Sequence, residues 1–223
     1  MMAVVRLMWY HLRVSLSWSA LLPPLALVAL CAVLSIAVSP HDRSPGMELA
    51  LEGGMPITTA FLVAPLIAGE TERGTLYWIA LRTSLIRVAA LRITLVVTYV
   101  LACCAVALAA MAAAWHIPLS WAMLLPGATR ALTFIGVAFL AASWGRTAMH
   151  GYLAPSALWL GFLMFGSALP QREPWLTLNP FAWAAGYPRH IVYQSMIAYS
   201  VLGVLLLLLQ PFLLRPERLI PQA

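Results

Sequence analysis

The side chains that could do chemistry in this chain form no familiar catalytic or metal-binding pattern. No HExxH or GxSxG motif occurs, and three cysteines without CxxC spacing predict neither a disulfide framework nor a zinc site. A metal site needs several ligands that converge, whereas the five histidines lie in loops or at the ends of apolar runs. We therefore expect no catalytic residues and no metal. The cysteines are Cys31, Cys103 and Cys104, and the histidines are His11, His41, His116, His150 and His190.

The absence of lysine excludes one further chemistry. A phosphate-binding loop of the GxxxxGKS or GxxxxGKT type needs a lysine that reaches the terminal phosphates of ATP. The sequence contains no lysine at all. We therefore expect this chain to be no enzyme and to hold no cofactor, so any ATP and magnesium would be bound by a separate subunit.

Charged residues are concentrated in one segment, 70–87. Its first residues are Glu70, Glu72, Arg73, Gly74 and Thr75. After them Leu76, Ile79 and Ala80 recur at helical spacing, so one face of a short helix is apolar while the other can carry Arg82. The pattern predicts a surface helix that docks on a partner.

The rest of the chain has the composition of a membrane protein. Hydrophobic residues make up 63% and charged residues 9%, against about 45–50% and about 25% in soluble domains. A bilayer core about 30 Å thick needs about 20 apolar helical residues per span. Six runs approach or reach this length: 19–38, 53–69, 88–114, 119–144, 152–169 and 191–214.

Two of these runs are irregular. The run 53–69 is short and holds two prolines, and 119–144 is interrupted by Pro126, Gly127 and Arg130. In the other four spans we find no acidic residue within the apolar core, and intramembrane carboxylates are the usual relays of ion-coupled transporters. The sequence therefore argues against ion coupling and predicts a pathway without intramembrane charges.

Arginine distribution orients the predicted spans. One face holds Arg6, Arg13, Arg73, Arg82, Arg87, Arg92, Arg146, Arg215 and Arg218, and the other holds Arg43, Arg130, Arg172 and Arg189. The positive-inside rule makes the first face cytoplasmic, with both termini on it. We expect a multi-pass protein of the cell inner (plasma) membrane. The basic balance then reflects topology and contact with membrane lipid, with no nucleic acid as partner.

The two remaining segments lie at membrane surfaces. Residues 3–18 alternate basic and apolar side chains, which fits either an interfacial helix or a polar start to the first span. The long apolar run that follows exceeds the h-region of a cleaved signal peptide. The segment 170–190, here called the proline-rich segment, contains Pro170, Pro174, Pro180 and Pro188 and cannot form one continuous helix. We expect a re-entrant segment of short helices on the outer side.

Residues 70–76 resemble the loop between the second and third spans of type-2 ABC exporter permeases. In that family an acidic-x-acidic-basic-Gly-Thr-Leu pattern is followed by an apolar helix, and Glu70, Glu72, Arg73, Gly74, Thr75 and Leu76 match it directly. Arg87 and Arg92 fit later basic positions, whereas Ser84 stands where the family generally has proline. The resemblance covers about twenty residues; six spans, an interfacial helix and a proline-rich outer segment agree with it along the whole chain.

The resemblance implies a permease that works with a separate ABC ATPase subunit and a second permease subunit, identical or homologous. Residues 70–87 would be the coupling helix, with the six matching residues, Arg82 and Arg87 in contact with the ATPase. Short helices of the family's outer segment close the pathway, which makes Asn179, Pro180 and Phe181 gate candidates; an ordinary membrane-hugging loop is the alternative. The expected cargo is an amphiphilic lipid, drug or peptide.

The sequence thus predicts a single all-α transmembrane domain over 1–223, with six transmembrane helices, an N-terminal interfacial helix and a cytoplasmic coupling helix. An alternative function is a membrane scaffold without transport, or a membrane enzyme of unknown reaction. Only Arg146, His150 and Tyr152 lie near enough in sequence to offer such an enzyme a polar group.

Overall fold

The computed structural model describes residues 48–66, 84–116, 120–166 and 175–213. These residues form helices and turns without any strand, which confirms the all-α prediction for this part of the chain. The elements are η2 (Ala50–Gly54), α4 (Met55–Val63), α7 (Leu85–Trp115), η3 (Trp121–Met123), α8 (Leu124–Gly145), α9 (Ala148–Phe165), η5 (Trp175–Leu178) and α10 (Arg189–Leu213).

Three of the described helices are long and apolar enough to cross a membrane: Ile86–Ala113, Leu124–Gly145 and Arg189–Leu209. The apolar helix Ala50–Val63 is shorter. Large apolar side chains such as Leu160, Met164, Ile197 and Leu208 stay exposed on α9 and α10, as expected where lipid is the solvent. The chain thus has the helices of a membrane protein. The first predicted span, 19–38, and the interfacial helix, 3–18, lie outside the described residues.

Two helix boundaries differ from the predicted ones. The helix predicted to begin at residue 53 is already helical at Ala50, so Glu52 lies inside it. The long helix α7 begins at Leu85, and it therefore includes the last residues of the segment 70–87. Ser84, which precedes α7, is extended, with φ −67° and ψ 123°, so α7 begins after it although the residue is not a proline.

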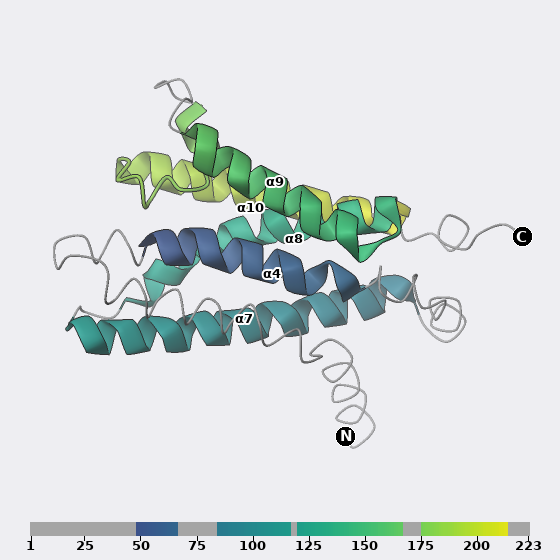
Figure 1. Cartoon of the computed structure of the whole chain (residues 1–223), viewed down its shortest axis with the longest axis horizontal. Helices are drawn as coiled ribbons and strands as arrows, with labels where there is room; N and C mark the ends of the chain where they lie inside the picture. Colours follow the sequence, from purple (N-terminus) through teal and green to yellow (C-terminus); the bar gives the residue numbers. More distant parts are fainter. Residues whose placement is uncertain (1–47, 67–83, 117–119, 167–174, 214–223) are drawn as a thin grey trace, which may run out of the picture.

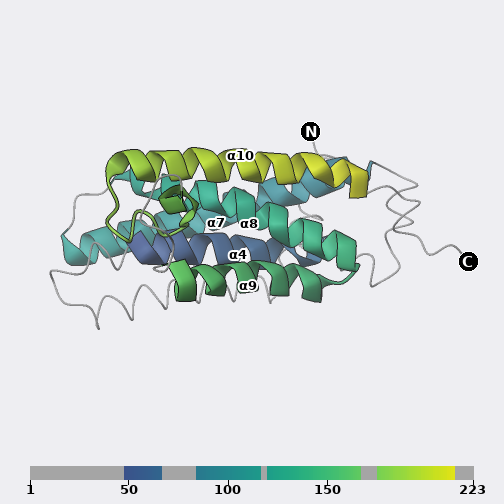
Figure 2. The same cartoon turned by 90° about the horizontal axis from the view of Figure 1, so that it is seen from above.

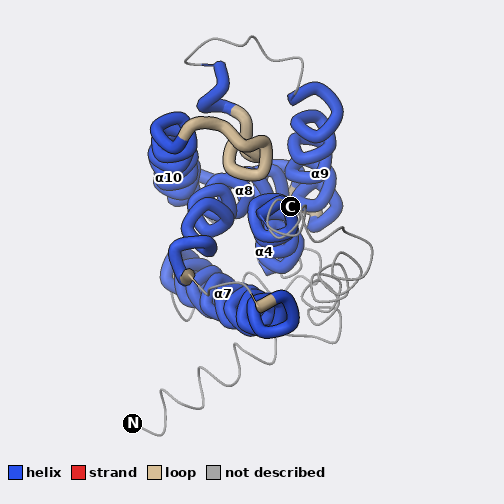
Figure 3. The backbone as a smooth tube through the Cα atoms, turned by 90° about the vertical axis from the view of Figure 1, so that its left-hand side faces the viewer, coloured by secondary structure: helices blue, strands red, loops and turns tan. Residues whose placement is uncertain are grey.

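The described helices form an antiparallel bundle (Figure 1). Successive helices α4, α7, α8, α9 and α10 run in alternating directions, so α4, α8 and α10 begin at the end where α7 and α9 finish. Seen from above, α10 and α9 lie at opposite edges of the bundle (Figure 2). We call the end with the starts of α4, α8 and α10 the proline-rich end, because the described part of the proline-rich segment lies there (Figure 3).

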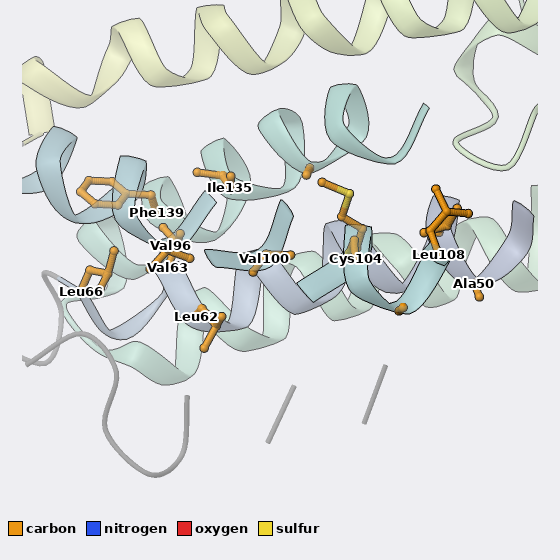
Figure 4. Close-up of a cluster of buried hydrophobic side chains, with 14 of the residues drawn as sticks. Ala50, Leu62, Val63, Leu66, Val96, Val100, Cys104, Leu108, Ile135 and Phe139 are labelled. Carbon is orange, nitrogen blue, oxygen red and sulfur yellow. The ribbon is translucent and has the colours of Figure 1, made fainter. Parts of the chain in front are cut away.

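Helix α8 is the centre of the packing, since it contacts α4, α9 and α10. A core of buried aliphatic and aromatic side chains fills the space between α4, α7 and α8 (Figure 4). Glycines allow two close approaches: a Cβ on Gly127 would lie 2.7 Å from the carbonyl oxygen of Leu51, and one on Gly203 would lie 2.8 Å from Leu132. Small residues of this kind let transmembrane helices pack backbone against backbone.

The end of α7 provides a stability prediction. The helix stops at His116, which has a left-handed φ of 55°, a conformation that costs a residue with a Cβ about 1 kcal/mol more than glycine. We expect His116→Gly to raise the midpoint of thermal unfolding in detergent. The matched control is Ala113→Gly, which places glycine inside the same helix and should lower the midpoint. A lower midpoint for His116→Gly would contradict the prediction.

Candidate functional site

A fully buried ion pair lies near the proline-rich end of the bundle. Nη2 of Arg130 lies 2.8 Å from Oε1 of Glu52, and neither side chain has any exposed surface. Arg130 lies six residues after the start of α8, which is about 9 Å along the helix at 1.5 Å per residue. Burial of two charges costs several kcal/mol for each ion unless their hydrogen bonds are satisfied. An ionisable pair at this position in a membrane protein is a candidate functional site.

Arg130 uses all three guanidinium nitrogens. Nε donates to the carbonyl of Pro180 at 2.6 Å, and Nη1 donates to the carbonyl of Pro126, one turn earlier in α8, at 2.8 Å. Nη2 also donates to Oγ of Ser195 on α10 at 3.2 Å. The guanidinium carbon lies 5.8 Å from the centre of the Tyr199 ring, within the range of a cation–π contact. One side chain thus joins α8, α10 and the proline-rich segment.

Both carboxylate oxygens of Glu52 also accept hydrogen bonds, and the donors belong to the proline-rich segment. Its Oε1 accepts a hydrogen bond from the backbone N–H of Trp183 at 3.2 Å, and its Oε2 accepts one from Ala184 at 2.9 Å. Glu52 stands in the π-helical turn Ala50–Gly54, and such turns are frequent at functional sites. The carbonyl of Gly53, in the same turn, accepts a hydrogen bond from Nε1 of Trp159 at 3.1 Å.

The carbonyls of the proline-rich segment are bound in sequence. The hydroxyl of Tyr199 donates to the carbonyl of Leu178 at 2.6 Å, and that of Ser195 donates to Asn179 at 3.4 Å. With the bond from Arg130 to Pro180, three successive carbonyls each accept from a side chain of a long helix. We call this cluster of Glu52, Arg130, Ser195 and Tyr199 the polar seat. It holds main-chain atoms of the segment, not its side chains.

The segment itself is folded into a turn over 180–186. The side chain of Asn179 begins it, because its Oδ1 accepts the N–H of Phe181 at 2.9 Å. Phe181 is buried, and its ring meets that of Trp159 edge to face with centroids 6.3 Å apart. A Cβ on Gly53 would lie 3.1 Å from the Phe181 ring. The apolar ring contacts α9 and the turn η2, while the polar seat holds the backbone beside it.

The predicted site residues fall in two places. The gate candidates Asn179, Pro180 and Phe181 lie together at the start of the turn, where the polar seat binds the carbonyls of Asn179 and Pro180. Arg87 is exposed near the start of α7, at the opposite end of the bundle. Arg92 is buried in α7 and donates to the carbonyl of Leu66 at 2.6 Å. The other predicted coupling residues lie outside the described residues: Glu70, Glu72, Arg73, Gly74, Thr75, Leu76 and Arg82.

The ion pair is not among the predicted site residues. The predicted second span begins after Glu52, and Arg130 is predicted to interrupt the run 119–144 and to belong to the outer face. Both groups are buried among the described helices, and the prediction of a pathway without intramembrane charges stays a prediction. One signal was present: an arginine within an apolar run requires a counter-ion. Four acidic residues flank spans on the same predicted face: Asp42, Glu48, Glu52 and Glu173.

The residues considered for a membrane enzyme lie around the connection from α8 to α9. Arg146 ends α8 with a left-handed φ of 57°. Thr147 Oγ1 lies 2.6 Å from Nδ1 of His150, a local contact at the start of α9. Tyr152 packs its ring edge to face against Phe61, with centroids 5.6 Å apart. Among the described residues, no three His, Cys, Asp or Glu side chains lie close enough to bind a metal ion.

No family model, curated protein or solved structure matches the chain. The function is therefore inferred from the residues and contacts of the chain itself.

Proposed function

We propose that the chain is the membrane-spanning permease subunit of an ATP-driven ABC exporter. The observation that carries the proposal is the ordered sequence Glu-x-Glu-Arg-Gly-Thr-Leu at 70–76, between α4 and α7. The arrangement of the helices supports it: α4 finishes and α7 begins at the same end of the bundle, opposite the proline-rich end (Figure 1). A segment that connects them is thus well placed to meet a partner at one membrane face.

The proposed topology has six spans, with both termini and the segment 70–87 on the cytoplasmic side of the inner membrane. Arg87 and Arg146 lie at the end of the bundle that this topology makes cytoplasmic, in agreement with the positive-inside rule. The proline-rich end then faces outward. Membrane lipid surrounds the exposed faces of α9 and α10.

In the proposed mechanism, two permease subunits pair around a pathway, and each docks residues 70–87 on an ABC ATPase subunit that binds ATP and magnesium. Closure of the ATPase pair moves the permeases between inward-open and outward-open states. Glu70, Glu72 and Arg73 can make charge-assisted hydrogen bonds to the ATPase. Glu52 and Arg130 neutralise each other, so the pathway still suits an amphiphilic lipid, drug or peptide better than a small ion.

Charge reversal in the docking segment tests the proposal. We expect Glu72→Lys and Arg73→Glu each to reduce co-purification with a co-expressed ABC ATPase subunit by about tenfold, because each replaces an attractive charge pair by a repulsive one. The double exchange Glu72→Arg with Arg73→Glu keeps the net charge and changes only the order of the charges. The measurement is the ratio of ATPase to permease in the purified membrane complex, together with its ATPase rate.

The control is Arg189→Glu, which reverses an exposed charge at the opposite end of the bundle and should leave the complex intact. If the unmodified chain purifies without any ATPase across several candidate partners, the permease proposal fails. A membrane scaffold without transport would then be the better explanation.

A further inference from the structure

We propose that Glu52 and Arg130 hold the proline-rich segment closed over its end of the bundle, and that the segment leaves the polar seat when the pathway opens on that side. This inference rests on the proposed function, since it is transport that requires the opening. The turn over 180–186 lies between α10 and α9 in the view onto this end of the bundle (Figure 3).

The contacts are suited to holding a segment that moves as one unit. Three successive carbonyls, of Leu178, Asn179 and Pro180, and two successive N–H groups, of Trp183 and Ala184, all bind side chains of the bundle. Arg130 binds the first residue of the turn, and Glu52 binds residues in its middle. Because the two ions also bind each other, they hold these two parts of the segment at a fixed separation.

The charged groups of the polar seat suit both the closed state, in which the segment is bound, and the open state, in which it has left. A buried ion pair adds little stability compared with apolar residues of the same size, so simple strength does not explain its presence. An apolar seat would expose hydrophobic surface to water whenever the segment left it. A charged pair near the end of the helices can instead be hydrated from that side, so that water replaces the hydrogen bonds that the segment gives up. The ionic seat therefore lowers the cost of the open state.

The chain also has a pivot beside the turn. Gly186 follows the last residues held by Glu52, has a φ of 70°, and has no atom within 4 Å of the position that a Cβ would take. Helix α10 begins at Arg189, directly after Pro188. Rotation at Gly186 can lift the turn while α10 keeps its place against α8.

The test measures how often Ala182 becomes exposed, since this residue belongs to the turn and is fully buried. Ala182→Cys is introduced into a chain whose three native cysteines are replaced by alanine, and the rate of reaction with a membrane-impermeant maleimide is measured in vesicles. We expect Glu52→Gln to accelerate labelling about tenfold or more, because a hydrogen bond to a charged group contributes a factor of that size to the closed state. Tyr199→Phe removes only the donor to Leu178 and should accelerate labelling less.

The control is Arg189→Gln, which removes an exposed charge at the same end and should leave the labelling rate unchanged. If Glu52→Gln and Tyr199→Phe both label at the rate of the parent chain, the polar seat does not hold the segment and the inference is overturned. Should Glu52→Gln fail to fold, Tyr199→Phe alone decides, because it removes one hydroxyl and leaves both charges paired.

The second measurement uses the complex with the ATPase. We expect ATP with magnesium to accelerate labelling of Ala182→Cys in the otherwise unmodified seat, and a fixed rate on a complex that hydrolyses ATP would overturn the inference while leaving the permease proposal intact. If no ATPase binds the chain, the permease proposal fails by itself. The substitutions at Glu52 and Tyr199 then still show whether the polar seat keeps the segment closed.

Discussion

Arg130→Met is expected to lower the free energy of unfolding by about 3–5 kcal/mol, because it leaves the Glu52 carboxylate buried without a counter-ion. The substitution also leaves the carbonyl of Pro180 without the donor that it has at 2.6 Å. Removal of one partner of a buried pair is far more costly than removal of both. Unfolding by denaturant or heat in detergent, followed by the loss of helical signal, measures the effect.

The double variant Glu52→Gln with Arg130→Met separates charge from shape. It removes both charges, while the glutamine carbonyl can still accept a hydrogen bond from the backbone of Trp183 or Ala184. We expect it to be more stable than Arg130→Met alone, which would give a double-mutant cycle with a large favourable coupling. Arg189→Met, at an exposed arginine, should change stability by less than about 0.5 kcal/mol. Equal losses for Arg130→Met and Arg189→Met would contradict the buried pair.

Gly203→Ala is expected to destabilise the bundle by about 1–3 kcal/mol through overpacking. The added Cβ would lie 2.8 Å from the backbone carbon and Cβ of Leu132 and 2.8 Å from the backbone nitrogen of Thr133. Because these contacts involve backbone atoms, α10 and α8 must separate to make room. The separation also strains the hydrogen bond from Thr133 to the carbonyl of Tyr199, which is 2.6 Å long.

The matched control for this substitution is Gly161→Ala in α9, where an added Cβ meets no atom within 4 Å. Alanine there should be neutral or should stabilise the helix by up to about 1 kcal/mol, since glycine is a weak helix former. Gly203→Ala should also weaken the polar seat, because Ser195, Tyr199 and Gly203 follow one another at four-residue spacing on the face of α10 toward α8. Equal stability of the two alanine variants would refute the close approach.

Composition and apolar length predict the helical class well, since a helix satisfies its backbone hydrogen bonds within one long charge-free run, whereas barrel strands need alternating apolar and polar residues. The second helix shows the limit of that reasoning. Gly53 and Gly54 are weak helix formers and mark a natural boundary in the sequence, yet the π-helical turn carries the helix through them. Packing against α8 and the bond from Trp159 to Gly53 stabilise this turn, and neither contact is visible in a local pattern. The six-span count and the docking role of 70–87 stay predictions.

The sequence predicts one part of the candidate site, the turn residues, but not the ion pair that binds them. The prolines point to a broken, re-entrant path, and this led to Asn179, Pro180 and Phe181. The ions that hold that path come from helices distant in sequence, and hydrophobic periodicity shows that a segment is helical without showing which helix is its neighbour. The adjacency of η2 and α8 is needed before Glu52 and Arg130 can be recognised as partners.

Because Glu52 and Arg130 bind main-chain atoms of the turn, these hydrogen bonds tolerate changes of the turn's side chains. Glu52 binds the N–H groups of Trp183 and Ala184, and Arg130 binds the carbonyl of Pro180. Any residue except proline, which lacks the N–H, can therefore form the bonds at 183 and 184. Side chains there can be exchanged for others of different size and polarity while the same bonds persist. The surface of this turn can thus change in sequence while its backbone stays bound to Glu52 and Arg130.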